Sequence, residues 1–381
     1  YRKAIQIKPD FAEAHHNLGN LLSYFGKLQD SEFSYRKAIK INPNYIKAYY
    51  SLSLLKYSDK NKKWKNQLFS NKILNEKSKD EQINIYFARA NILHKEKNYD
   101  ESSKYLKLAN QLKITIYPSN SDALIKKSKS LLIESNKQAI NQLKYKKSQE
   151  SIFIVGMPRS GSTLLESILS INSGVFDLGE SEILEESYLD YKTKNQELNL
   201  ADRYWNKIKD HKIKTTKTTN KNLYNYLYTG IIASEIPNAK IIHCYRNPLD
   251  NILSIYRANF TQGNQYSSSL IDCANVYLNQ DEIMNKYKTR FRSQIYDLNY
   301  DALVNNPKEE IESLISWLSW EWSDAYLSPH LNPRSVLTAS NIQVRYPINA
   351  NSIGGWKNYK HMLKPSIKIL TQIEKYRDLL L

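Results

Sequence analysis

The sequence predicts an all-α repeat array followed by an α/β domain with a P-loop-like, mainly parallel sheet. Three observations predict this fold class. A segment at the N-terminus recurs 34 residues later, short apolar runs beyond residue 150 alternate with amphipathic helices, and a glycine-rich loop follows the first of these runs. Such a repeat is typical of stacked helical hairpins, and the alternation is typical of a parallel sheet covered by helices on both faces. We expect helical hairpins over 1–113, a connecting helix or linker over 114–150 and the α/β domain over 151–381.

The composition indicates a basic, globular protein. The 381 residues include 55 Lys and Arg against 38 Asp and Glu, a formal net charge of +17, and 41% are hydrophobic, too many for a disordered polybasic tail. The lysines are dispersed and no recognition-helix signature occurs, so we expect no nucleic-acid binding. The basic charge therefore indicates a solvated surface, a site for a polyanion, or both.

The two cysteines, Cys244 and Cys273, lack the spacing of a metal site or a disulfide framework. They fit a reducing compartment, so we expect the chain to be cytoplasmic. No window approaches 18 uninterrupted apolar residues, and we expect no membrane segment in the given chain. Because the chain begins at Tyr1, we expect it to be part of a longer protein whose N-terminus could carry a targeting signal.

The repeat is visible at the very start of the chain. The first five residues, Tyr-Arg-Lys-Ala-Ile, recur at residues 35–39, and Pro9 recurs as Pro43. The small and large residues between the copies resemble the tetratricopeptide pattern, and a weaker copy covers residues 90–109. The resemblance implies a concave face that binds a protein or peptide partner, with a structural spacer as the alternative.

Strand and helix patterns follow the repeats. Residues 121–149 carry apolar residues at helical spacing, which predicts a connecting helix. The apolar run 152–155 predicts a strand, and the segment 162–169 predicts a helix. A second unit has a strand over 239–245 and a helix that begins near Pro248, where a missing N–H costs nothing. Ligands of such sheets bind at the carboxyl ends of the strands.

The loop from Gly156 to Thr163 has the glycine spacing of a phosphate-binding loop between a strand and a helix. It lacks the lysine that nucleotide triphosphatases use, and its cation is Arg159. Backbone N–H groups and the helix N-terminus still favour binding of an anion. Transfer of the γ-phosphate of a nucleotide is disfavoured, because the lysine is missing. A ligand-free turn is the alternative.

The residues of this loop also resemble the 5′-phosphosulfate-binding loop of sulfotransferases. The similarity is greatest to the protein-tyrosine sulfotransferases and to tetratricopeptide-fused members. The residues that carry it, and that would bind the donor, are Pro158, Arg159, Ser160, Gly161, Ser162 and Thr163.

A second block supports the resemblance. Sulfotransferases place an Arg after a strand and a Ser eight residues later, and here Arg246 follows the strand 239–245 and Ser254 comes eight residues on. A guanidinium fork and a hydroxyl suit a phosphate. The resemblance implies that the two residues hold the 3′-phosphate of the co-substrate 3′-phosphoadenosine 5′-phosphosulfate (PAPS), and that no metal is required.

The resemblance also indicates catalytic groups. Glu180, 21 residues after Arg159, stands where the family has a general base, with Glu182 as the alternative. Charge that develops on the leaving oxygen needs a cation, for which Arg159 and Lys221 are candidates. The proline that commonly follows this lysine in the family is missing after Lys221. Lys217 is therefore the alternative candidate for the catalytic lysine.

The C-terminal part resembles the segment that closes over the donor in sulfotransferases. By this resemblance Ser340, Gln343, Val344 and Arg345 would pass over the adenosine. Trp356 would begin the last helix, and we expect it to pack in the core.

These observations predict a sulfotransferase that moves a sulfonate from PAPS to a hydroxyl acceptor. A tyrosine in a protein is the acceptor that the resemblance and the repeats favour, while a glycan, lipid or small metabolite stays open because fold and donor do not determine the acceptor. A P-loop kinase-like phosphotransferase and a non-enzymatic repeat scaffold with a degenerate nucleotide domain are the alternatives.

Overall fold

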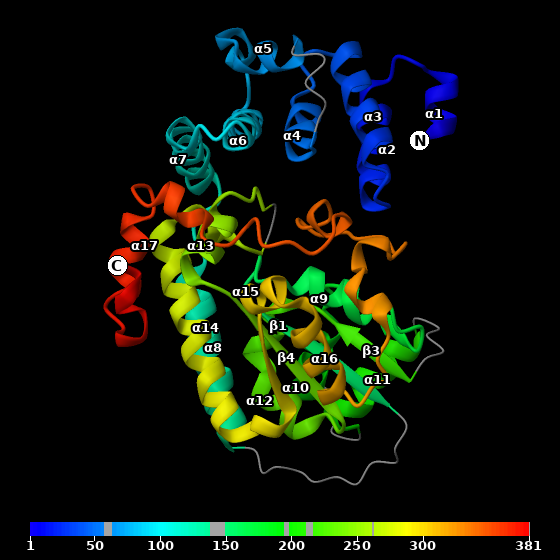
Figure 1. The fold of residues 1–381 in the computed structure, drawn as a ribbon, viewed down its shortest axis with the longest axis vertical. Coiled ribbons are helices and arrows are strands. Elements are labelled where there is room, and N and C mark those ends of the chain that lie inside the picture. Colours follow the sequence, from blue (N-terminus) through cyan, green and yellow to red (C-terminus); the bar gives the residue numbers. More distant parts are fainter. Residues whose placement is uncertain (57–62, 138–148, 194–197, 211–215, 261–262, 381) are drawn as a thin grey trace.

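A computed structural model describes residues 1–56, 63–137, 149–193, 198–210, 216–260 and 263–380. Its helical N-terminal part forms one layer above an α/β domain (Figure 1). The helices of the N-terminal layer are α1 (Arg2–Ile7), α2 (Ala12–Tyr24), α3 (Leu28–Ile41), α4 (Ile46–Leu54), α5 (Lys63–Phe69), α6 (Lys79–Lys95) and α7 (Tyr99–Ile116). Within the described ranges, no helix combines the length and the hydropathy needed to cross a membrane.

The hairpin of α2 and α3 is held together by a close approach at Gly19. A Cβ at Gly19 would lie 2.6 Å from the Tyr35 ring, so the absence of a side chain lets Tyr35 pack directly on α2. Ser31 Oγ donates to the Gly19 carbonyl oxygen across the same contact, at 2.8 Å. The second hairpin, α6 and α7, begins with a capping box in which Ser78 and Glu81 satisfy each other's backbone N–H groups.

The α/β domain is built on a parallel sheet. In the part of the chain that the structure describes, the sheet has five strands in the order β2-β3-β1-β4-β5, and each neighbouring pair is parallel. The strands are β1 (Glu150–Gly156), β2 (Val175–Asp177), β3 (Lys217–Asn220), β4 (Ala239–Tyr245) and β5 (Ile295–Asn299). The predicted fold class is therefore confirmed.

Helices cover both faces of the sheet. They are α8 (Ser121–Lys137), α9 (Ser162–Leu169), α10 (Ile183–Thr193), α11 (Leu200–Asp210), α12 (Thr229–Glu235), α13 (Pro248–Tyr256), α14 (Leu270–Phe291), α15 (Tyr300–Asn305), α16 (Pro307–Trp317) and α17 (Lys364–Leu370). Along β1, Phe153 and Val155 pack with α8, α10, α11, α12 and α14, whereas Ile152 and Ile154 pack with α9 and α16. This alternation follows from the two-residue period of a strand, and it explains the continuous apolar run of β1.

The expected connecting helix belongs to the α/β domain. It forms α8, whose Ser128 Oγ donates to Asn279 Oδ1 of α14 at 2.6 Å, while Leu131 is buried in the core of the domain. The rest of the predicted connecting segment, 138–148, lies outside the described residues.

The repeats and the α/β domain share one hydrophobic core. Phe87 and Leu106 of the repeats belong to the same buried cluster as Leu253 of α13 and Tyr359. The Tyr359 hydroxyl is hydrogen-bonded to His94 Nδ1 at 2.8 Å and to Ser102 Oγ at 3.0 Å, both on repeat helices. The two layers are therefore packed against each other by apolar contacts and by polar bonds.

The chain after α16 forms a further link between the layers. Asn341 Nδ2 donates to Ser23 Oγ, and the Val336 N–H donates to the Tyr24 carbonyl oxygen, each at 3.1 Å. Figure 1 shows this segment, in orange, running between the repeat helices and the sheet.

We expect Tyr359→Ala to lower the free energy of unfolding by about 3–5 kcal/mol, because it removes a buried aromatic ring from the contact between the layers. The measurement is urea unfolding followed by circular dichroism. The control, Tyr359→Phe, keeps the ring and loses the hydroxyl, which should cost about 1 kcal/mol. An unchanged unfolding free energy in the alanine variant would contradict this packing.

Candidate functional site

The loop after β1 turns sharply at two glycines. Gly156 has φ 142°, and a Cβ on it would lie 2.2 Å from the Cys244 carbonyl oxygen of β4. Gly161 has φ 97° and is the residue that precedes α9. Because the first N–H groups of a helix have no intrahelical acceptors, the loop presents donors at the carboxyl edge of the sheet.

The loop residues that the sequence predicts for the donor lie around this turn. The Pro158 carbonyl oxygen accepts from Asn251 Nδ2 at 2.9 Å, which holds the loop against α13. Ser160 and Ser162 are buried, and Ser160 Oγ has no partner among the described residues. Thr163 Oγ1 lies 3.2 Å from Thr338 Oγ1, within hydrogen-bond distance of the C-terminal segment.

Arg159 lies at the centre of the loop. Its backbone is left-handed, with φ 68°. Its Nε donates to Ser254 Oγ at 3.1 Å, and its Nη1 donates to Ser340 Oγ. Burial, followed by the nearby Arg246 and Arg257, lowers the pKa of Arg159 to about 10. Burial removes hydration from these guanidinium groups, and their like charges repel one another. A bound polyanion would offset both unfavourable terms, so the arrangement favours one.

Arg246 follows the carboxyl end of β4 beneath the same loop. Its Nη2 donates to the Ser352 carbonyl oxygen at 3.0 Å, and its guanidinium lies 4.6 Å from the centre of the Tyr300 ring. Asp250 and Asp301 each approach it to 4.0 Å. Its side chain is 5% exposed, and Nε has no hydrogen-bond partner among the described residues. A buried N–H without a hydrogen-bond partner can donate to an oxygen of a bound ligand.

Lys221 and Glu180 form an ion pair beside α9. Lys221 follows β3, and its side chain is 1% exposed, whereas that of Glu180 is 56% exposed. Lys221 Nζ donates to Glu180 Oε1 at 2.7 Å and lies 4.0 Å from Glu166 Oε2 on α9. Lys221 thus lies between the buried carboxylate of Glu166 and the accessible carboxylate of Glu180. Glu182, the alternative candidate for the base, is exposed.

Lys217 lies at the other end of β3. It pairs in register with Glu150, the first residue of β1, and its Nζ lies 3.8 Å from Glu150 Oε2. The phosphate-loop candidate begins at the opposite, carboxyl end of β1. The geometry therefore favours Lys221 over Lys217 as a group that acts at the loop.

Arg334 is a residue that the sequence analysis missed. Its Nη2 donates to Glu166 Oε2 at 2.9 Å, and its Nη1 donates to Asp177 Oδ2. Glu166 is 2% exposed, and burial raises its pKa, although Lys221 and Arg334 act in the opposite direction. Arg334 lies in an irregular segment without a recognisable pattern, so the sequence carries no signal for its contact.

The C-terminal residues predicted to pass over the adenosine make different kinds of contact in the structure. Ser340 accepts from Arg159, and Gln343 lines a cavity beside that arginine. Val344 is buried, and Arg345 donates to the carbonyl oxygens of Tyr24, Asn332 and Arg334. Arg345 thus ties this segment to the turn after α2.

Trp356 has the packing role that the sequence analysis expected. It is buried in the core that the two layers share, and its backbone N–H donates to Asp250 Oδ1 at 2.9 Å. It lies in a short 3-10 helix, Gly355–Tyr359, which precedes α17.

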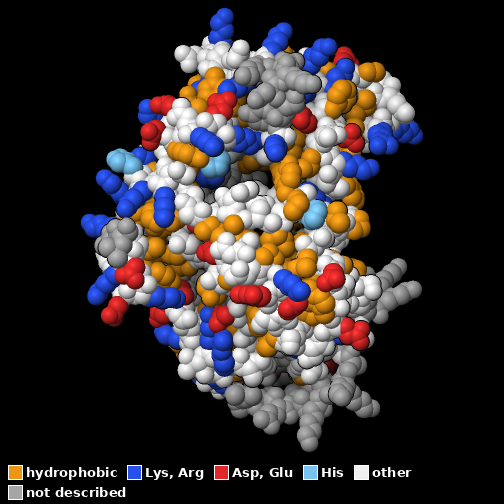
Figure 2. Space-filling model, viewed as in Figure 1, with side chains coloured by type: hydrophobic (Ala, Val, Ile, Leu, Met, Phe, Trp, Pro, Cys, Tyr) orange, Lys and Arg blue, Asp and Glu red, His pale blue; other side chains and the backbone are white. Residues whose placement is uncertain are grey.

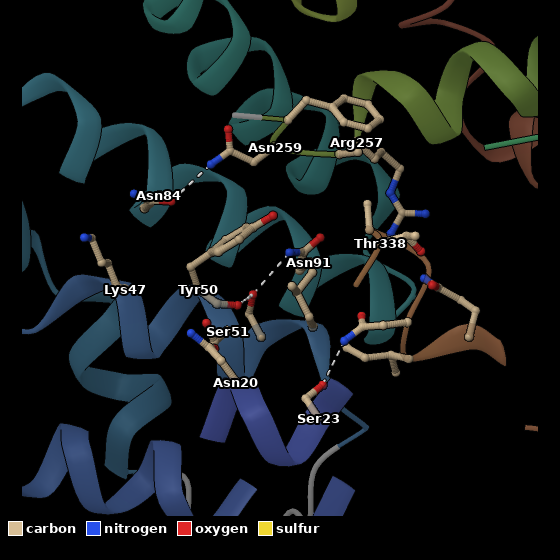
Figure 3. Close-up of a pocket in the computed structure, with 18 of the residues that line it drawn as sticks. Asn20, Ser23, Lys47, Tyr50, Ser51, Asn84, Asn91, Arg257, Asn259 and Thr338 are labelled. Atoms are coloured by element: carbon tan, nitrogen blue, oxygen red, sulfur yellow. Dashed lines mark hydrogen bonds between the residues drawn. The ribbon is translucent and has the colours of Figure 1, made fainter. Parts of the chain in front are cut away.

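A cavity of about 1110 Å³ opens between the repeats and the loop. Its walls come from α2, α3, α4, α6 and α7 on one side and from Arg159, Ser254, Arg257 and the segment 337–343 on the other. Figure 2 shows the surface hollowed where the two layers meet, and Figure 3 shows Lys47, Tyr50 and Arg257 among the side chains around the cavity. Glu180 and Lys221 are not among its lining residues, so it adjoins the Arg159 side of the loop.

Comparison with known families agrees with this geometry. Residues 151–201 and 184–324 match the sulfotransferase family, and residues 12–45 and 83–113 each match a tetratricopeptide repeat. The chain thus has a region that matches the sulfotransferase family, and before it two segments that match tetratricopeptide repeats. The parallel sheet and the loop after β1 lie in the region that matches the sulfotransferase family.

Relatives with this domain are distant. A protein of Aquifex aeolicus named only as uncharacterized is 29% identical over 329 residues, 77% of this chain and 43% of that protein. A protein-tyrosine sulfotransferase of Drosophila melanogaster is 23% identical over 238 residues, 56% of this chain and 48% of that protein. The chain thus spans about half the length of these two relatives. A solved sulfotransferase domain from the curacin biosynthetic pathway has a TM-score of 0.43 and 17% identity, over 60% of this chain and 98% of that chain.

We expect Arg334→Gln to destabilise the α/β domain more at about pH 8 than at about pH 5. The variant removes one of the two cations near Glu166, so the raised pKa of this carboxyl should rise further. When the folded pKa lies above the unfolded value, stability falls as the pH rises from the unfolded value to the folded one. Urea unfolding at the two pH values should show a loss of about 3 kcal/mol at the higher pH.

The matched control adds Glu166→Gln to the Arg334→Gln variant. It removes the titrating carboxyl, so the difference between the two pH values should disappear. An equal loss at both pH values in the single variant would contradict the proposed role of Glu166.

Proposed function

We propose that this protein transfers a sulfonate group from PAPS to a hydroxyl acceptor. The observation that carries the proposal is the arrangement of Arg159, Arg246 and Ser254 around one strand-to-helix loop, with the Lys221–Glu180 ion pair beside the same helix. The sulfotransferase-family match supports this reaction class.

The residues present suit a donor with phosphate and sulfate groups. Gly156 leaves the room that a close backbone turn needs, and Ser160 Oγ and Arg246 Nε are buried donors without partners among the described residues. Arg246 and Ser254 would hold the 3′-phosphate, and the loop N–H groups before α9 would hold the 5′-phosphosulfate. Ser340, Gln343, Val344 and Arg345 would close the adenosine side.

Bound PAPS supplies an activated sulfonate, and the protein supplies the acid–base and electrostatic groups. Glu180 would accept the proton of the acceptor hydroxyl as the new S–O bond forms, because the neutral hydroxyl is a weak nucleophile. Its partly exposed carboxylate can meet an incoming acceptor, while the ion pair with Lys221 holds it in place.

The bond between sulfur and the bridging oxygen breaks in the same step, and the oxygen keeps the electron pair on the 5′-phosphate. Lys221 and Arg159 would stabilise this charge from two sides of the loop. Lys221 suits the task because burial strengthens its interaction with a developing negative charge.

For the acceptor, we propose a tyrosine hydroxyl in a protein or peptide. The support is the similarity to proteins named protein-tyrosine sulfotransferase and the fused tetratricopeptide repeats, which commonly present partner-binding surfaces.

The first test is isothermal titration of adenosine 3′,5′-bisphosphate, the expected product, in magnesium-free buffer. We expect the wild type to bind it and Arg246→Ala to lose about 100-fold or more in affinity, because a buried charge-assisted contact is removed. Absence of binding by the wild type at millimolar ligand would contradict the proposed donor. Magnesium-dependent turnover of ATP would instead support a kinase-like reaction.

The second test measures transfer of labelled sulfonate from PAPS to a tyrosine-containing peptide. Glu180→Gln removes the base, and Lys221→Ala removes a cation at the leaving group, so each should lower kcat about 100- to 1000-fold. Lys217→Ala is the matched control, since this lysine lies at the opposite end of β3. If Lys217→Ala lowers kcat as much as Lys221→Ala, the assignment of the catalytic lysine is wrong.

A further inference from the structure

One segment of the chain, residues 332–345, connects the first repeat hairpin to the loop that we propose to bind the donor. Ser340 Oγ accepts from Arg159 Nη1 of this loop. The next residue contacts the repeats: Asn341 is buried, and its Nδ2 donates to Ser23 Oγ near the end of α2, at 3.1 Å (Figure 3). The position of Ser340 therefore depends on how this segment is held against the repeats.

Arg345 anchors the segment to the repeat layer. Its Nη2 donates to the carbonyl oxygen of Tyr24, the last residue of α2, at 2.6 Å. The same guanidinium donates to the carbonyl oxygens of Asn332, at 2.9 Å, and of Arg334, at 2.6 Å. The last carbonyl oxygens of a helix have no intrahelical N–H partner and favour a cation. One side chain thus joins both ends of the segment to the end of a repeat helix.

The backbone between this anchor and Ser340 is folded by hydrogen bonds. The Val344 N–H donates to the Ser340 carbonyl oxygen at 3.3 Å, and the Arg345 N–H donates to that of Ile342 at 3.2 Å. The Ile342 side chain packs against the buried cluster of the repeats. Because these contacts fix the chain between the two residues, a displacement of Arg345 should also displace Ser340.

The repeat turn leaves room for this arginine at Gly26. Its φ is 74°, and a Cβ on it would lie 2.9 Å from Arg345 Cδ. The turn between α6 and α7 has the corresponding backbone hydrogen bonds and carries Lys97 at the left-handed position, with φ 61°. Such a turn can therefore form with a side chain at this position. At Gly26, Arg345 takes the space that a side chain would need.

We propose that Arg345 is a positioning residue of the donor site, which acts through Ser340. It anchors the segment to the turn after α2, and Ser340 then holds Arg159 in the orientation that binds the donor. The inference rests on the proposed function, because it concerns the donor of that reaction. The Arg159 guanidinium donates to two hydroxyls, those of Ser254 and Ser340, so it loses less side-chain freedom when the donor binds. The first repeat hairpin thereby contributes to donor affinity.

The test measures the affinity for adenosine 3′,5′-bisphosphate by isothermal titration in wild type, Gly26→Asn and Arg345→Gln. Asparagine tolerates a left-handed backbone, so Gly26→Asn displaces the arginine while the turn is kept. We expect each variant to weaken binding about 5- to 10-fold, because Arg159 loses the hydroxyl that orients it. Circular dichroism melting curves show whether each variant is folded.

Lys97→Asn is the matched control, because it places asparagine at the equivalent left-handed position of the second hairpin. It should bind the bisphosphate within about 2-fold of the wild type, since the proposed contact is local to the first hairpin. If Lys97→Asn weakens binding as much as Gly26→Asn does, the effect comes from altered repeat turns in general, and the inference is wrong.

A double-mutant cycle tests whether the repeat turn acts through Ser340. Ser340→Ala removes the hydroxyl that accepts from Arg159 and should weaken bisphosphate binding about 5- to 10-fold. Adding Gly26→Asn to Ser340→Ala should cost less than about 2-fold more, since the contact that it disturbs is already lost. A loss of fold stability alone would not depend on Ser340 in this way. Losses that multiply would show two independent effects and overturn the inference.

The outcomes also separate this inference from the proposed function. If the wild type does not bind the bisphosphate, the proposed donor fails and the inference fails with it. If the wild type binds it, and the folded Gly26→Asn and Arg345→Gln variants bind it equally tightly, only the role of Arg345 is overturned.

Discussion

The close approach of β1 to β4 at Gly156 is the constraint on which the rest of the site depends. No side chain fits between this position and the Cys244 carbonyl oxygen, and the positive φ of Gly156 also favours glycine. The turn that follows brings Arg159 across α13 and starts α9 after Gly161. Since β1 and β4 are parallel, their carboxyl ends meet at one edge of the sheet, and the loop, Arg246 and the N-terminus of α9 share that edge.

The basic side chains at this edge of the sheet differ in whether they have carboxylate partners. Lys221 has two carboxylates within 4.0 Å, and Arg334 bridges Glu166 and Asp177, so these groups form an ion-pair network within the protein. Arg159 and Arg257 have no carboxylate partner among the described residues, and burial lowers the pKa of both. In the proposed reaction, the groups with ion-pair partners would position the base and stabilise the leaving group, whereas the arginines without a carboxylate partner would bind the polyanionic donor.

The tetratricopeptide repeats are part of the same packed unit as the α/β domain. They share a core with α13 and α14, and α2, α3, α4, α6 and α7 contribute to one wall of the cavity beside Arg159. In this arrangement, Tyr50 of the repeats lies near Arg159, and Tyr359 of the C-terminal part is hydrogen-bonded to His94 of the repeats.

The sequence by itself determined what depends on local pattern: the helical repeat, the parallel α/β fold and the loop from Gly156 to Thr163. Such features are encoded by residues close together in the chain, through periodicity and the conformational freedom of glycine. The sequence left Lys217 and Lys221 as competitors, and it carried no signal for Arg334. Only the tertiary structure decided these points, because the direction of β3, the course of the C-terminal segment and the packing of the repeats onto α13 bring together residues that are far apart in the chain.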